Sequence, residues 1–196
     1  KYSGHLKWAR RIAVVLFALG VIALIAVWAY FAALGRDVPS IAKLKQYEPP
    51  ITSRVHAGDG TLIAEFADQH RVFVPYESIP EYVIQAFVSA EDKNFFTHDG
   101  LDYAGITRGA VNTAKNKITG SGGMQGGSTI TQQVAKNMLL TRDQNIERKA
   151  KEAIVAQRIE KEFTKGQILE LYLNEIYLGG QSYGVASASL NYFNKS

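Results

Sequence analysis

The chain has 196 residues, of which 46% are hydrophobic and 20% are charged, and this balance excludes an intrinsically disordered protein. The formal net charge is +4, but four of the 22 basic residues, Lys1, Lys7, Arg10 and Arg11, precede residue 12, and the 18 that remain equal the 18 acidic residues. Because the basic excess is confined to the N-terminal end, it argues against a nucleic-acid-binding surface, and the absence of cysteine excludes a disulfide framework.

Residues 12–34 form an uninterrupted run of 23 uncharged residues. At ~1.5 Å per residue, a helix of this length crosses the ~30 Å hydrocarbon core of a membrane. The sequence therefore predicts a transmembrane helix over 12–34, preceded by a cytoplasmic basic tail over 1–11, with everything after the helix on the far side of the membrane. A cleaved signal peptide is the alternative, since small residues stand near Ala32.

The residues after this helix change in character twice. Residues 35–50 contain Pro39, Pro49 and Pro50, which favour a short stalk with little helix. Beyond it, residues 54–56 and 61–66 flank a Gly-Asp-Gly turn sequence, and this pattern predicts a small β hairpin.

The rest of the chain is predicted to be helical. Apolar residues at helical spacing predict a helix that ends near Glu91, and Ser128-Thr129 predicts the N-cap of a helix that begins at Ile130. The glycine-rich residues 120–127 between them are expected to form a mobile loop. A third apolar stripe is predicted to be core, and it consists of Ile168, Leu169, Tyr172, Leu173 and Ile176.

Two of these predicted helices suit an anionic ligand. A helix that begins behind a glycine loop presents backbone N–H groups to anions, although a polar face of this kind is more often plain solvated surface. On a later helix, Arg148 and Lys149 lie four and three residues before Glu152, so two cations flank one carboxylate. An ordinary surface ion-pair ladder is the alternative interpretation of this cluster.

Five short motifs, which occur in a fixed order, favour the ligand-binding interpretation of these helices over a plain charged surface. Residues 91–100 match E-D-x-x-F-x-x-H-x-G, residues 127–133 read Gly-Ser-Thr-Ile-Thr-Gln-Gln, and residues 148–152 match R-K-x-x-E. Residues 165–174 match K-x-x-I-L-x-x-Y-L-N, and a fifth motif follows over 184–193. From about Arg54 to the C-terminus, the chain resembles a family 51 peptidoglycan glycosyltransferase, the transglycosylase domain of class A penicillin-binding proteins. Asn194 departs from the glycine common in that family.

The resemblance implies a mainly α, lysozyme-like domain with a small β hairpin over 51–196, preceded by one N-terminal transmembrane helix. The chain is expected to be a fragment, because it stops just after the fifth motif. The implied activity is the polymerisation of lipid II into β-1,4 glycan strands, with inversion at the sugar and release of polyprenyl diphosphate.

The resemblance also assigns roles to residues. Glu91 is implied as the general base on the acceptor 4-hydroxyl, and Glu152 as a second essential carboxylate that orients the cations or helps to hold a divalent metal, Mg or Mn. No organic cofactor is implied. Asp92, Phe95 and His98 are implied to support the Glu91 turn. The implied substrate-binding residues are Ser128, Thr129, Gln133, Lys136, Asn137, Arg148 and Lys149.

The implied partners are lipid II, the growing lipid-linked glycan chain, the lipid bilayer, and proteins of cell-wall synthesis, elongation or division, without nucleic acid. The implied location is the cytoplasmic (inner) membrane, crossed once, with the catalytic domain on its periplasmic or extracellular side. A muramidase or lytic transglycosylase is one alternative, but it needs no diphosphate site of the kind that Lys136, Arg148 and Lys149 indicate. An inert membrane-anchored scaffold is the other alternative, and it would not require Glu91 or Glu152.

Overall fold

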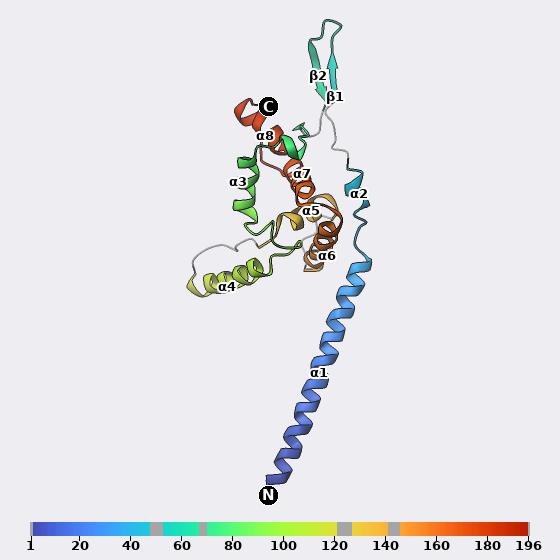
Figure 1. Cartoon of the computed structure of the whole chain (residues 1–196), viewed down its shortest axis with the longest axis vertical. Helices are drawn as coiled ribbons and strands as arrows, with labels where there is room; N and C mark the ends of the chain where they lie inside the picture. Colours follow the sequence, from blue (N-terminus) through green and yellow to red (C-terminus); the bar gives the residue numbers. More distant parts are fainter. Residues whose placement is uncertain (1, 48–52, 67–69, 121–126, 141–145, 196) are drawn as a thin grey trace. The chain divides into compact units, whose positions relative to one another are not determined.

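A computed structural model of the chain describes residues 2–47, 53–66, 70–120, 127–140 and 146–195. The chain forms two compact units, Lys1–Val38 and Pro39–Ser196, each with its own structure. Within the described residues the fold is mainly helical, with a small β hairpin and a long apolar helix at the N-terminus, as predicted (Figure 1).

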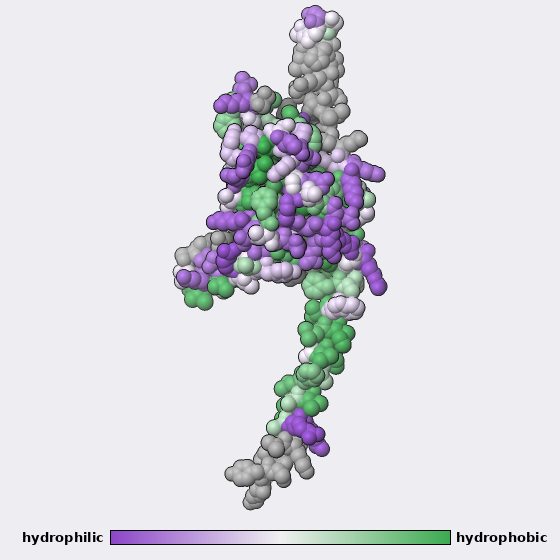
Figure 2. Space-filling model, viewed as in Figure 1, coloured by the Kyte–Doolittle hydropathy of each residue, from purple (hydrophilic) through white to green (hydrophobic). Residues whose placement is uncertain are grey.

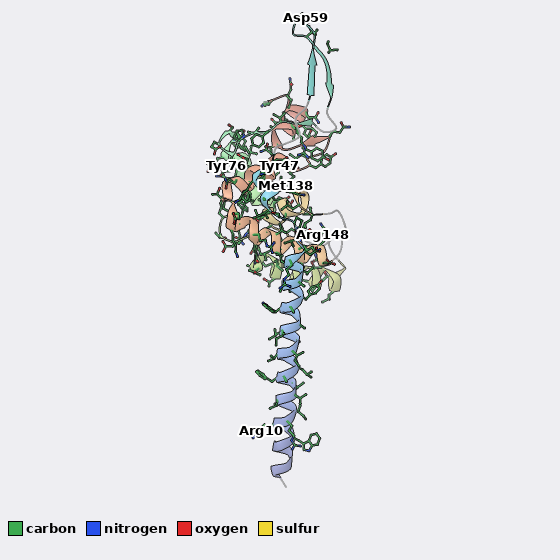
Figure 3. The ribbon with its side chains drawn as sticks, turned by 90° about the vertical axis from the view of Figure 1, so that its right-hand side faces the viewer. Arg10, Tyr47, Asp59, Tyr76, Met138 and Arg148 are labelled. Atoms are coloured by element: carbon green, nitrogen blue, oxygen red, sulfur yellow. The ribbon has the colours of Figure 1, made fainter. Side chains whose placement is uncertain are left out.

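The first unit consists of one helix, α1 (Tyr2–Arg36), which contains the predicted membrane span. Its residues Trp8–Arg36 are long enough and apolar enough to cross a membrane, and none of the most apolar stretch is buried in the protein. Figure 2 shows this apolar surface as a continuous band along the helix. Arg10 lies near its N-terminal end (Figure 3), where a positive charge can meet lipid headgroups.

The second unit begins with the predicted stalk and hairpin. A one-turn helix, α2 (Ala42–Lys45), forms in the stalk, where little helix was expected; it buries Leu44, and Lys45 forms an ion pair of 2.7 Å with Glu162. Strands β1 (Ser53–His56) and β2 (Leu62–Phe66) pair antiparallel and confirm the hairpin. Asp59 lies at its tip (Figure 3), and its carboxylate accepts a hydrogen bond of 2.9 Å from the Thr61 N–H.

Three helices, α5 (Ile130–Met138), α6 (Ile146–Glu162) and α7 (Lys165–Glu175), pack together as the core of this unit (Figure 1). Helices α5 and α7 each begin with a capping box, made by Thr129 with Gln132 and by Thr164 with Gln167. Such caps satisfy the free N–H groups of the first turn, so the start of each helix is well defined. The side chains that are fully buried between these helices include Ile130, Val134, Val155, Ile159, Ile168, Leu169 and Leu173.

Further helices complete the second unit: the 3-10 turn η1 (Tyr76–Ser78), α3 (Glu81–Glu91), α4 (Tyr103–Thr119) and α8 (Val185–Phe193). Helix α3 ends at Glu91, as predicted from the apolar spacing. The end of α3, the start of α4 and the residues just before α5 lie around one pocket, and Glu91 and Ser128 of the first two sequence motifs line it.

A short parallel pair of strands, β3 (His70–Arg71) and β4 (Ser182–Tyr183), connects distant parts of the chain. The Arg71 guanidinium pairs with Glu175 at the end of α7 and lies 4.6 Å from the centre of the Tyr183 ring. Burial raises the pKa of Glu175 to about 7. This buried carboxyl therefore has two opposing influences, desolvation that favours its neutral form and an arginine that favours its charge.

Candidate active site

Glu91 is the last residue of α3, and its side chain is exposed. Its Oε2 accepts a hydrogen bond of 2.8 Å from the Nε2 of Gln133 on α5. An amide donor orients a carboxylate without neutralising it, so Glu91 keeps its capacity to accept a proton. The helix end thus presents an oriented carboxylate to solvent.

The turn that follows Glu91 is held by a buried network. The carboxylate of Asp92 accepts hydrogen bonds from the Nε2 of His98 at 2.9 Å and from the backbone N–H of Ile130 at 3.0 Å. The His98 Nδ1 accepts from the Gly100 N–H at 3.1 Å, so the ring proton is assigned to Nε2. Asp92 therefore ties the end of α3 to the first residue of α5.

The same turn is packed tightly against α5 and α6. Gly100 has a φ of +89°, and a Cβ placed there would lie 2.9 Å from the backbone carbon of Ala156, so glycine is required at this position. The Gly100 carbonyl accepts a hydrogen bond of 2.7 Å from the Thr129 hydroxyl. These contacts fix the turn from both ends.

Phe95 fills the centre of the turn with no exposed surface. The Lys165 ammonium at the start of α7 lies 4.4 Å from the centre of the Phe95 ring and donates a hydrogen bond of 2.6 Å to the His98 carbonyl. Asp92, Phe95 and His98 thus lie in the wall that shapes the turn, where none of them faces the solvent as Glu91 does.

A cluster of charges forms on α6. The Glu152 carboxylate is 2% exposed, and its two oxygens pair with Arg148 at 2.7 Å and with Lys149 at 2.8 Å. Helical spacing of four and three residues places both cations over the one carboxylate. The Lys149 ammonium also donates to the Ser128 hydroxyl at 2.6 Å and is half exposed. With two positive charges and one negative charge, the cluster retains a net attraction for an anion.

A pocket of about 220 Å³ lies beside Glu91. Glu91 contributes to one part of its lining and Ser128, which contacts Lys149, contributes to another. The α6 cluster itself does not line this pocket, and Ser128 is the lining residue that contacts it through Lys149. The lining residues of the pocket are Ala90, Glu91, Asp92, Lys93, Asp102, Gly105, Arg108, Gly109, Asn112, Gly127, Ser128 and Thr129.

Three charged residues in this lining, Lys93, Asp102 and Arg108, were given no role on sequence grounds. Asp102 caps α4, and hydrogen bonds from the Gly105 N–H and then the Asn94 amide lower its pKa, aided by the charge of Arg108. Arg108 lies 3.7 Å from the Asp102 carboxylate. An aspartate at the N-cap position is the sequence signal that could have placed α4, and with it this wall of the pocket.

The remaining predicted residues fall into two groups. Lys136 and Asn137 are exposed on α5, and Gln133 of the same helix is partly exposed. Thr129 differs from the expected substrate-binding role, because its side chain is 1% exposed and its hydroxyl caps α5 and bonds Gly100. The glycine-rich residues 121–126, expected to be a mobile loop, lie outside the described residues.

The residues around Glu152 do not fit a divalent metal. Both of its carboxylate oxygens face cationic side chains. These side chains would repel a metal cation, and they occupy the space that a metal ion would need beside the carboxylate. Within the part of the chain that the structure describes, no three His, Cys, Asp or Glu side chains are grouped closely enough to hold a metal ion. The expected role of Glu152 as a metal ligand is therefore not supported by its contacts.

Comparisons with known proteins identify the family of the chain. The family model described as Transglycosylase matches residues 59–196. The chain is similar to penicillin-binding protein 1A of Rickettsia felis, with 51% identity over 161 residues, which are 82% of this chain and 20% of that protein. It is also similar to penicillin-binding protein 1A of Aquifex aeolicus, with 47% identity over 82% of this chain and 22% of that protein.

A third relative, penicillin-binding protein 1A of Neisseria flavescens, is 39% identical over 92% of this chain and 22% of that protein. The chain thus spans about a fifth of the length of the curated relatives it matches. Together with α1, these relatives indicate a membrane-anchored protein. Because the family model covers more than half of the residues, the chain belongs to the transglycosylase family.

Proposed function

We propose that the second unit is a peptidoglycan glycosyltransferase that extends a glycan strand from lipid-linked disaccharide units. Glu91 takes the proton of the acceptor 4-hydroxyl as that oxygen attacks the anomeric carbon of the donor sugar. The bond between this carbon and the diphosphate breaks, and polyprenyl diphosphate leaves with the electron pair. Direct displacement inverts an α-linked donor, so the new bond is a β-1,4 linkage.

The observation that carries this proposal is the pocket that Glu91 and Ser128 share. The attacking hydroxyl oxygen gains positive charge as it bonds the anomeric carbon, until the base removes its proton. Negative charge develops on the departing diphosphate. An oriented carboxylate in the pocket, and a cationic cluster that contacts the pocket residue Ser128 through Lys149, match these two demands. A hydrolase of the same polymer has no departing diphosphate and no use for the cations.

Arg148 and Lys149 are proposed to bind the diphosphate of the donor, together with Ser128, which bonds Lys149, and Lys136 on α5. Glu152 holds the two α6 cations in place through its two ion pairs, so its proposed role is to position them. A divalent metal, which the family resemblance implies, would have to be held mainly by the substrate's own oxygens. The described residues supply no site for it, and no step is assigned to it.

The membrane topology is proposed from the positions of the basic residues in the sequence. Basic residues before the apolar helix favour a cytoplasmic N-terminus, which places the second unit on the periplasmic or extracellular side. Lipid II, the lipid-linked glycan product and the bilayer are the proposed partners. Proteins of cell-wall elongation or division, which the family resemblance implies, are proposed as further partners.

The test is polymerisation of labelled lipid II in detergent by the wild-type protein, with products separated by length and digested by a muramidase. Glu91→Gln and Glu152→Gln are expected to lower the rate by ~100-fold or more. Glu147→Gln is the matched control, because Glu147 lies on α6 and pairs with Lys151 at 3.0 Å while half of its side chain is exposed.

Two results would contradict the proposal. A wild-type protein that shortens preformed glycan and makes no polymer would be a muramidase or lytic transglycosylase. A protein that does neither, with Glu91→Gln indistinguishable from wild type in cell-wall binding, would be a scaffold.

A further inference from the structure

Tyr172 on α7 has a feature that the core packing does not explain. Its side chain is 1% exposed, and its hydroxyl is buried without a hydrogen-bond partner among the described residues. Buried hydroxyl groups are nearly always paired, because desolvating one without a partner costs folding free energy. A phenylalanine would fill the same space without this cost, so the hydroxyl calls for a reason.

The position of Tyr172 supplies one. Its ring packs edge-on against Phe87 of α3, with ring centres 6.1 Å apart and an angle of 78° between the planes. Phe87 lies four residues before Glu91, so both side chains share one face of α3. Burial, and then the negative charge of Glu91, raise the pKa of Tyr172 above its ordinary value. The phenol therefore keeps its proton and remains a donor.

Glu91 has the complementary capacity. Its Oε2 accepts from Gln133, and within the described part of the chain no donor bonds its Oε1. Tyr172, a buried donor without an acceptor, thus packs through its ring against the face of α3 that also carries Glu91, whose Oε1 has no protein donor among the described residues. Hydrogen bonds of catalytic groups are often long in the free enzyme and shorten only when the substrate is bound.

We propose that the Tyr172 hydroxyl is a positioning group for Glu91, to which it donates a hydrogen bond when the acceptor sugar occupies the pocket. This inference rests on the proposed function of Glu91 as the base. Gln133 and Tyr172 would then hold the two carboxylate oxygens from α5 and α7, which pack against each other. The carboxylate lone pair that takes the proton is thereby aimed at the acceptor hydroxyl.

Other charged groups face the same carboxylate, and the test must separate their effect from that of Tyr172. Asp92, Lys93, Asp102 and Arg108 line the pocket beside Glu91. All four remain when only the Tyr172 hydroxyl is removed. A change in the pH dependence of the rate can then be assigned to this one donor.

The experiment compares wild type with Tyr172→Phe, which keeps the ring contact with Phe87. The kcat for polymerisation of lipid II is expected to fall roughly tenfold, with KM within about twofold, because the lost bond orients the base without binding substrate. The acidic limb of the kcat profile, which reports the substrate-bound enzyme, is expected to move to higher pH, because the carboxylate loses a donor that favours its ionised form. The thermal unfolding midpoint is expected to stay level or rise, because the hydroxyl has no partner to lose.

Tyr192→Phe is the matched control, because the Tyr192 hydroxyl on α8 donates to the Leu178 carbonyl at 3.0 Å. It should leave the acidic limb in place. A rate for Tyr172→Phe within twofold of wild type, or a rate loss without movement of the acidic limb, would overturn the inference and leave the proposed function standing. A wild-type protein that makes no polymer would overturn both.

Discussion

The two carboxylates proposed to be essential occupy opposite environments. Glu91 ends α3, is exposed, and bonds the neutral amide of Gln133, whereas Glu152 is 2% exposed and lies between Arg148 and Lys149. Glu152 is enclosed by two cations and shielded from substrate, whereas Glu91 bonds a single amide and faces the solvent. The difference matches the two tasks proposed for one residue type, proton transfer at Glu91 and the placement of cations at Glu152.

The largest expected effect on stability separates the two carboxylates. Glu152→Gln is expected to destabilise the second unit by about 2 to 3 kcal/mol, less than for a fully buried pair because half of Lys149 is exposed. Its thermal unfolding midpoint should fall by roughly 5 to 10 °C. Glu91→Gln, the matched change at the exposed site, should stay within about 0.5 kcal/mol. Equal thermal unfolding midpoints for Glu152→Gln and Glu91→Gln would contradict the proposed difference between the buried and the exposed carboxylate.

The exposed carboxylate also depends on the buried turn after it. Gly100→Ala is expected to cost about 2 kcal/mol, because the backbone is left-handed and the new Cβ would overlap Ala156. Gly58→Ala in the hairpin turn is the control, since a Cβ there meets no atom within 4 Å. Thermal unfolding of both variants in detergent measures the difference. A Gly100→Ala protein as stable as the control would show that the turn can relax.

The amide beside Glu91 provides a smaller effect. Gln133→Ala is expected to lower kcat for polymerisation roughly tenfold, equivalent to about 1.4 kcal/mol, because the carboxylate loses one of its orienting bonds. Gln85→Ala is the matched control, since Gln85 donates to Glu81 at 2.9 Å on the exposed surface of α3. If both variants retained the wild-type rate, orientation by Gln133 would be irrelevant to catalysis.

A pH-dependent effect concerns a third carboxyl, Glu175, whose pKa burial raises to about 7. The folded state then holds a proton that the unfolded chain releases, so this group lowers stability as the pH rises between its ordinary value and about 7. The unfolding midpoint of wild type should fall relative to that of Glu175→Gln over this window. The opposite trend would mean that the Arg71 ion pair outweighs desolvation.

The sequence predicts local features of this fold well. The hairpin at Asp59, the end of α3 at Glu91 and the cap of α5 at Thr129 all follow from short-range rules on turns, apolar spacing and capping. The placing of Arg148 and Lys149 over Glu152 follows from helical spacing alone.

Features that depend on long-range packing could not be predicted in this way. Thr129 was assigned to substrate, but the approach of the Gly100 carbonyl buries its hydroxyl. Lys165 was part of a motif, yet only the fold brings it to the Phe95 ring. Tyr172 fits a core stripe by its spacing, and nothing in that spacing shows that Phe87 of α3 packs against its ring.

The central claim is that Glu91 acts in chemistry and leaves substrate binding to other groups. The most direct test measures lipid II binding and polymerisation for wild type and Glu91→Gln in the same detergent. Binding within about twofold of wild type, together with a polymerisation rate lower by ~100-fold or more, is the predicted result. If binding and rate fell together by the same factor, Glu91 would be a binding residue and its assignment as the base would be wrong.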